Sequence, residues 1–213
     1  MYYRDLGHGM LKVSTISFGA WQIGDSAFWG GVDAADAERT VQCAMDAGIN
    51  LFDTAEMYGQ GESERVLGRA LGRRRHQVYI ASKVSPENCD PESLRAACEG
   101  SLKRLNTDYL DLYQVHWPSR QVPFEDTYAA LLRLREEGKI REIGLSNFGC
   151  ADMATWFDKG DAVSNQLGYN LLFRAAEYEV IPQSRKQGMG VLAYMPLMQG
   201  LLTGRYAAIE DIP

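Results

Sequence analysis

The sequence predicts an α/β fold: a parallel (β/α)8 TIM barrel, truncated after strand 7, with an N-terminal β-hairpin. Strand-like and helix-like segments alternate along the chain, which implies a parallel sheet with right-handed crossovers. Ionisable or amide side chains stand where many strand-like runs end, as at the carboxyl end of a barrel. No G-x-G-x-x-G motif follows the first strand, as a doubly wound dinucleotide fold would require. These observations favour the barrel over the doubly wound sheet.

The elements follow one another at nearly even intervals. Residues 2–14 alternate around Gly7 and Gly9 and predict the hairpin. The β-rich runs that follow predict strands at Val13–Trp21, Asn50–Thr54, Val78–Val84, Tyr109–His116, Glu142–Ser146, Ala162–Tyr169 and Gly190–Pro196. Amphipathic segments predict helices at Ala34–Ala47, Ser63–Leu71, Pro91–Leu105, Pro123–Glu137, Cys150–Phe157 and Ala175–Lys186. The basic run Arg73–His76 is interpreted as the solvated end of a helix.

The number of elements is smaller than a complete barrel needs. A (β/α)8 barrel takes about 250 residues, and the chain has 213. We therefore expect residues 1–213 to form a single incomplete barrel domain. The missing strand would leave two sheet edges unpaired, and such edges favour association between copies of the chain.

Composition excludes several classes of partner. The chain is 46% hydrophobic with a net charge of −6, which argues for one buried core and against nucleic acid or an anionic membrane. It has neither a membrane-span-like run nor a signal-peptide pattern. Its cysteines are isolated, which suggests a reducing cytoplasm. Its three histidines lack metal-type spacing, so we expect no metal site.

Four ionisable residues on successive runs form a candidate site: Asp53, Tyr58, Lys83 and His116. A phenol titrates near pH ~10, and a neighbouring ammonium lowers that pKa, so Lys83 would assist Tyr58 as a proton donor. Asp53 would hold Lys83, and His116 would orient a carbonyl oxygen. Each residue also has a structural explanation alone: a cap, a packing tyrosine, a surface lysine and a core histidine. Four together at one end of a barrel favour carbonyl reduction.

Six blocks in order resemble the aldo-keto reductase superfamily, closest to bacterial members called general stress proteins. They are FDTAEMYGQGESERVLGRAL (52–71), IASKV (80–84), DLYQVHWP (111–118), IGLSNF (143–148), SNQLGYNLL (164–172) and YMPLMQGLLTGRY (194–206). The opening GAWQIG and FWGG (19–31) support the bacterial subgroup. The resemblance covers essentially the whole chain.

The resemblance implies site residues beyond the four. Ser146, Asn147 and Gln166 match positions that hold the nicotinamide carboxamide of NADP(H), and Tyr194 matches the aromatic residue that stacks on its ring. Other cofactor positions are Asp53, Gly19, Ala20, Trp21, Leu197, Gln199 and Leu201. A substrate pocket is expected from Trp21, Phe28, Trp29, Met57, Tyr58, His116 and Trp117, although aromatic residues there can equally anchor loops.

The resemblance implies an oxidoreductase that reduces small aldehydes or ketones with NADPH, with Tyr58 as the proton donor. Family members continue further, and that part holds the adenosine 2′-phosphate and distinguishes NADPH from NADH. Two alternatives differ in class. One is a non-catalytic barrel module like the β subunits of potassium channels, and the other is a remnant that pairs with another copy.

Overall fold

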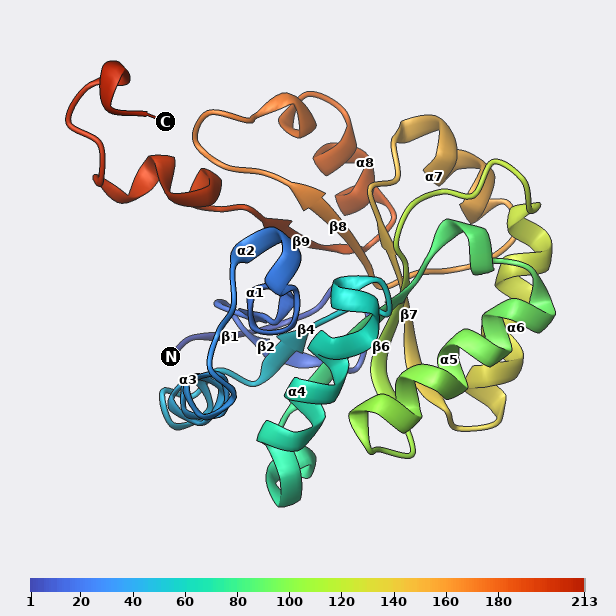
Figure 1. The fold of residues 1–213 in the computed structure, drawn as a ribbon. Helices are drawn as coiled ribbons and strands as arrows, with labels where there is room; N and C mark the ends of the chain where they lie inside the picture. The colour runs from blue at the N-terminus through green and yellow to red at the C-terminus, as the bar shows by residue number, and fades with distance from the viewer. Residues whose placement is uncertain (213) are drawn as a thin grey trace.

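The computed structural model describes residues 1–212 and contains one curved parallel sheet in the order β3-β4-β5-β6-β7-β8-β9 (Figure 1). An antiparallel hairpin of β1 and β2 precedes it. The strands are β1 Tyr3–Asp5, β2 Lys12–Ser14, β3 Phe18–Gly19, β4 Leu51–Asp53, β5 Tyr79–Val84, β6 Leu110–Val115, β7 Ile140–Ser146, β8 Ser164–Gly168 and β9 Gly190–Tyr194. The predicted barrel topology is confirmed, including its seven strands.

Helices follow most of the strands and cover the outside of the sheet (Figure 1). The α-helices are α1 Trp21–Gly24, α2 Ser26–Trp29, α3 Ala34–Asp46, α4 Glu62–Leu71, α5 Pro91–Leu105, α6 Phe124–Glu136, α7 Cys150–Phe157 and α8 Val180–Lys186. The 3-10 helices are η1 Tyr58–Gly61, η2 Gly72–Gln77, η3 Pro86–Asn88, η4 Ala175–Glu177, η5 Met198–Thr203 and η6 Ile209–Asp211.

Local chemistry explains where the long helices begin and end. The Asp33 carboxylate accepts from two backbone N–H groups of the first turn of α3, which satisfies donors that the helix leaves open. Asp90 caps α5 in the same way, and Pro91 follows as the first helical residue. Helix α5 ends where Asn106 adopts a left-handed conformation.

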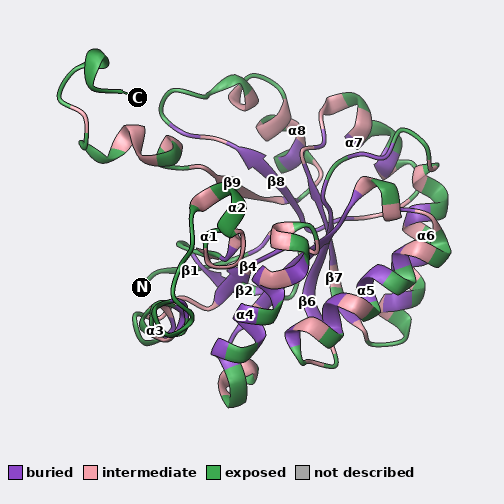
Figure 2. Ribbon diagram, in the orientation of Figure 1, coloured by how far each residue is buried: buried purple, intermediate pink, exposed green. Residues whose placement is uncertain are grey.

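The core lies between the sheet and these helices (Figure 2). Strand β6 is buried at every position, as expected for a parallel strand that is covered on both faces. A second apolar cluster closes the amino end of the barrel, where Leu6, Leu11 and Val13 of the hairpin region pack against Leu112 and Val163. The hairpin was predicted from the sequence, and the structure confirms it.

Two predicted elements differ in the structure. The run Val13–Trp21 was predicted to be one strand, but the chain leaves β2 at Ser14, whose hydroxyl donates to the Ile16 carbonyl. Barrel strand β3 is only Phe18–Gly19, and Trp21 begins α1. The predicted helix Ala175–Lys186 is divided into η4 and α8, which begins at Val180.

The interpretation of Arg73–His76 as a solvated helix end is wrong for Arg75. Its guanidinium pairs with the buried Asp111 carboxylate at 2.8 Å and donates to the carbonyls of Val78 and Tyr109. The contacts of Arg75 therefore connect η2 to strand β6.

The two edges of the sheet, β3 and β9, are not paired with each other. A cleft of about 960 Å³ opens between the hairpin and β9 with α8, and no one of Asp53, Tyr58, Lys83 and His116 lines it. Within residues 1–212, no helix has the length and apolar character needed to cross a bilayer.

Candidate active site

The strand ends deliver the four predicted residues to one place. Asp53 is the last residue of β4, Lys83 lies at the end of β5, and His116 directly follows β6. Tyr58 opens η1, in the loop that leads from β4 to α4. Parallel pairing aligns the carboxyl ends of these strands, so residues far apart in sequence meet.

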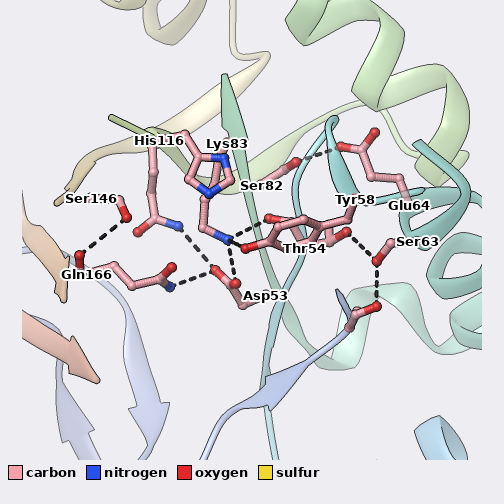
Figure 3. A network of polar contacts seen from close by, with 12 residues as sticks. Asp53, Thr54, Tyr58, Ser63, Glu64, Ser82, Lys83, His116, Ser146 and Gln166 are labelled. Atoms are coloured by element: carbon pink, nitrogen blue, oxygen red, sulfur yellow. Dashed lines mark hydrogen bonds and ion pairs between the residues drawn. The ribbon is translucent and has the colours of Figure 1, made fainter. Parts of the chain in front are cut away.

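Lys83 is at the centre of this cluster, and its side chain is 0% exposed. Its ammonium donates to Asp53 Oδ1 at 2.5 Å, to the Thr54 carbonyl at 2.9 Å and to the Tyr58 hydroxyl at 3.2 Å (Figure 3). An ammonium has three hydrogens, and each of them has an acceptor here. This set of contacts compensates for burying the charge. We call Asp53, Tyr58, Lys83 and His116 the tetrad.

The second carboxylate oxygen of Asp53 is held by two glutamines. Oδ2 accepts from Gln166 Nε2 at 2.9 Å and from Gln114 Nε2 at 3.2 Å. Gln166 was expected at the cofactor, but Gln114 was not singled out from the sequence. The signal was a polar residue inside an otherwise apolar run, Tyr113–Val115, two positions before a candidate histidine.

The electrostatics keep Tyr58 protonated. Burial raises the pKa of Tyr58 above its usual 10.0, while the Lys83 charge acts in the opposite direction without cancelling it. The expectation that Lys83 brings this pKa down overall is therefore not met, because burial dominates. Burial by itself would lower the pKa of Lys83, but Asp53 and Tyr58 raise it above its usual value. The site thus presents a protonated phenol beside a fixed positive charge.

His116 is neutral. Burial, together with the Lys83 charge, lowers its pKa to about 3. Its ring meets the Tyr58 ring edge to face, with centroids 5.6 Å apart. Its Nδ1 is buried and has no hydrogen-bond partner among residues 1–212. A neutral imidazole offers one N–H donor, which suits contact with a carbonyl oxygen.

The residues expected at the carboxamide gather beside the tetrad. Asn147 Nδ2 donates to the His116 carbonyl at 3.0 Å and to Ser146 Oγ at 3.0 Å. Tyr194 donates its hydroxyl to Asn147 Oδ1 at 2.8 Å. Asn147 has a φ of 62°, an unusual conformation for a non-glycine residue that turns its side chain back toward the strand ends. Gln166 completes this group through its bond to Asp53.

The first barrel strand and the two short helices that follow it contribute residues with different surroundings. An added Cβ at Gly19 would meet no heavy atom within 4 Å, so the space beside it is open. Ala20 is fully buried, and its carbonyl accepts from Ser63 Oγ at 2.6 Å. Trp21 stacks on Tyr58 with centroids 5.3 Å apart and on Phe28 at 4.8 Å. Trp29 meets Trp21 edge to face.

The remaining expected residues lie further out. Met57 and Trp117 are exposed next to Tyr58 and His116 in the chain. Leu197 is exposed and caps η5, in which Gln199 and Leu201 lie. Figure 1 shows this segment extending away from the sheet after β9. Their roles toward a cofactor or substrate stay predictions.

A buried ion pair near the site was also missed from the sequence. Glu64 is 0% exposed and accepts from Arg104 Nε at 2.5 Å and from Ser82 Oγ at 2.6 Å. Ser82 precedes Lys83, so the pair connects α4 and α5 to the strand that carries Lys83. Glu64 and Arg104 lie on the polar face of two helix patterns, which gave no sign of burial.

Comparison with known proteins agrees with this geometry. Residues 15–213 match the aldo/keto reductase family, and the chain belongs to that family. It is 39% identical over 215 residues to Aldo-keto reductase YhdN of Bacillus subtilis (strain 168), covering 96% of this chain and 65% of YhdN. It is 41% identical over 194 residues to Methylglyoxal reductase YeaE of Escherichia coli (strain K12), covering 90% of this chain and 66% of YeaE.

Solved structures show the same barrel. An aldo/keto reductase from Klebsiella pneumoniae, crystallised in complex with NADP and acetate, is 36% identical and superposes with a TM-score of 0.83. The match covers 94% of this chain and 69% of the Klebsiella chain. The chain thus spans 65% and 66% of the length of the two curated relatives.

Proposed function

We propose that this chain carries the catalytic centre of an NADPH-dependent aldo-keto reductase that reduces small aldehydes or ketones. One observation carries the proposal: the Lys83 ammonium lies 2.5 Å from Asp53 and 3.2 Å from the Tyr58 hydroxyl in a buried site. A phenol beside a fixed positive charge can give up its proton because the charge stabilises the phenolate that forms.

The residues beside the tetrad fit a nicotinamide. Ser146, Asn147 and Gln166 offer hydroxyl and amide groups that both donate and accept, as a carboxamide needs. Gln166 Oε1 accepts no hydrogen bond from the described residues, so it is available to a ligand N–H. Tyr194 supplies a flat aromatic face, and its bond to Asn147 fixes the ring. When bound, NADPH supplies the hydride.

Each residue of the tetrad has a separate role in the proton transfer. Tyr58 donates its hydroxyl proton to the carbonyl oxygen as the oxygen gains charge. Lys83 stabilises the phenolate, and Asp53 keeps Lys83 charged and in place. The neutral His116 donates an N–H to the same carbonyl oxygen and sets its orientation. Tyr58 is then protonated again from solvent.

The aromatic border of this polar site supports the proposed substrate class. Trp21 lies against Tyr58, and Met57 and Trp117 adjoin the tetrad, so an apolar mouth would surround the reacting carbonyl. YeaE is named a methylglyoxal reductase. Methylglyoxal is therefore the first substrate to test.

The test compares NADPH-dependent reduction of methylglyoxal by the wild-type chain, Tyr58→Phe and Tyr113→Phe. Tyr113 is a matched control because its hydroxyl is buried without a partner among residues 1–212 and lies outside the tetrad. We expect Tyr58→Phe to lose activity by at least about 10²-fold. Tyr113→Phe should keep it. Full turnover in Tyr58→Phe would show that Tyr58 is not the proton donor.

A further inference from the structure

Residues outside the tetrad also hold the carboxylate of Asp53. Its Oδ1 binds Lys83, but its Oδ2 depends on Gln114 and Gln166. Gln166 is one of the residues proposed to hold the cofactor carboxamide. If Gln166 turns toward that ligand, Asp53 loses one of the two amides that fix its carboxylate.

The surroundings of Gln114 leave its side chain little room to move. It is 0% exposed and lies in β6 directly opposite Lys83 in the parallel register, so both side chains point into the barrel. On its other side it pairs with Gly144. A Cβ at Gly144 would come within 2.8 Å of Gln114 Cγ and 2.7 Å of Ser164 Oγ, so the glycine leaves the space that this side chain fills.

The chemistry also fixes which way the Gln114 amide faces. Its Oε1 has no hydrogen-bond partner among residues 1–212, and its one side-chain hydrogen bond runs from Nε2 to Asp53. An ionised carboxylate only accepts hydrogen bonds, so a flipped amide would place oxygen against oxygen. The orientation of Gln114 is therefore set by Asp53, and Gln114 in turn holds Asp53.

We propose that Gln114 is a positioning residue that anchors Asp53 from the barrel interior, so that the Asp53–Lys83–Tyr58 contacts survive when Gln166 turns to a bound nicotinamide. The inference rests on the proposed function for the role of Gln166. The anchoring of Asp53 by Gln114 in the free protein does not rest on the proposed function.

The first test uses NMR of the side-chain amides in protein labelled with ¹⁵N-glutamine. The signals are assigned by their loss in Gln114→Met and Gln166→Leu. We expect the Gln114 amide to exchange with solvent slowly in the free protein. Addition of NADP⁺ should shift the Gln166 signal and leave the Gln114 signal in place. A rapidly exchanging Gln114 amide, or its displacement by NADP⁺, would overturn the proposal.

The second test separates positioning from folding by steady-state kinetics. Gln114→Met should lower kcat about tenfold, part of what a placed proton donor supplies, with KM for NADPH within about twofold of wild type. Ser164→Ala removes a neighbouring unpartnered hydroxyl and should change neither. If Gln114→Met does not fold, Gln114→Glu keeps the length and should also lower kcat. Unchanged kcat in the folded variant would refute the positioning role.

The two tests distinguish the proposals. If the wild-type chain neither binds NADP⁺ nor reduces carbonyls, the proposed function fails. The exchange rate of the Gln114 amide still decides whether Gln114 anchors Asp53.

Discussion

A fully buried lysine, Lys83, lies at the centre of the site. Lys83 gives all three of its hydrogens to Asp53, Thr54 and Tyr58. Burying a charge costs free energy unless hydrogen bonds compensate for the lost water. Three such bonds also fix the positions of the groups that accept them. The tyrosine, rather than the lysine, is the group that can change its proton during a reaction, because Asp53 holds Lys83 in its charged form.

Lys83→Met tests the effect of that charge on Tyr58. Lys83 lowers the pKa of Tyr58 against the larger effect of burial. Its removal should therefore raise this pKa further and move the alkaline limb of the pH–rate profile to higher pH. The maximal rate should fall by at least about tenfold because the phenolate loses its stabilising charge. The measurement is kcat for methylglyoxal reduction across pH, and an unchanged profile would remove Lys83 from the mechanism.

His116 should make the protein less stable in acid. Its pKa is about 3 in the folded chain, against about 6.5 when unfolded. Between these values the unfolded chain binds more protons, so the free energy of unfolding falls as the pH drops from about 6.5 toward 3. One group contributes a slope of at most about 1.4 kcal/mol per pH unit. Urea unfolding of wild type and His116→Asn across this range should show a smaller slope in the variant; equal slopes would contradict the neutral histidine.

At the level of elements, strands β4 to β9 each bring a polar residue to the site, at or near the carboxyl end of the strand. That regularity is why the sequence allowed Asp53, Lys83, His116 and Gln166 to be assigned to one end of a barrel. The role of Gln114 could not be assigned, because one polar residue in an apolar run does not show which side chain it contacts. Its contact with Asp53 exists only once β4 and β6 lie on one curved sheet.

Helices α4 and α5 are connected by the ion pair between Glu64 and Arg104, which the helix patterns of the sequence do not reveal. Arg104→Met would leave the Glu64 carboxylate, which is 0% exposed, without its charged partner. We expect the free energy of unfolding to fall by about 3 kcal/mol. Arg95→Met, which breaks the exposed pairs of Arg95 with Glu99 on the same helix and with Glu137, is the control and should change little. Denaturation in urea measures both; equal effects would mean that the buried pair contributes no more than the exposed one.

The whole molecule is an open barrel over the described residues. The sequence predicted this from the number of strands, and it predicted the hairpin at the amino end from the glycines around which residues 2–14 alternate. It did not predict that barrel strand β3 would be short, because the pattern in Val13–Trp21 is shared between a hairpin strand, a turn and a barrel strand. Patterns of period two do not reveal where a chain changes from one sheet to another.

The open edges β3 and β9 should allow copies of this chain to associate. Val191, Leu192 and Ala193 of β9 line the cleft beside the hairpin, and parallel edges with unpaired backbone groups accept further strands. We expect the mass measured by light scattering to rise with protein concentration. Val191→Lys places a charge at this edge and should reduce the effect. A constant monomer mass in wild type would contradict association through the edges.

We propose that these residues form a nicotinamide site beside a proton-donating tyrosine. Calorimetric titration of the 213-residue chain with NADPH, with NADH for comparison, tests it most directly. We expect saturable binding of NADPH to wild type and equal affinity for Tyr58→Phe, because the Tyr58 hydroxyl would contact the carbonyl of the substrate and not the nucleotide. A folded chain that gives no binding heat with either nucleotide, at any temperature tried, would show that these residues do not form a nicotinamide site.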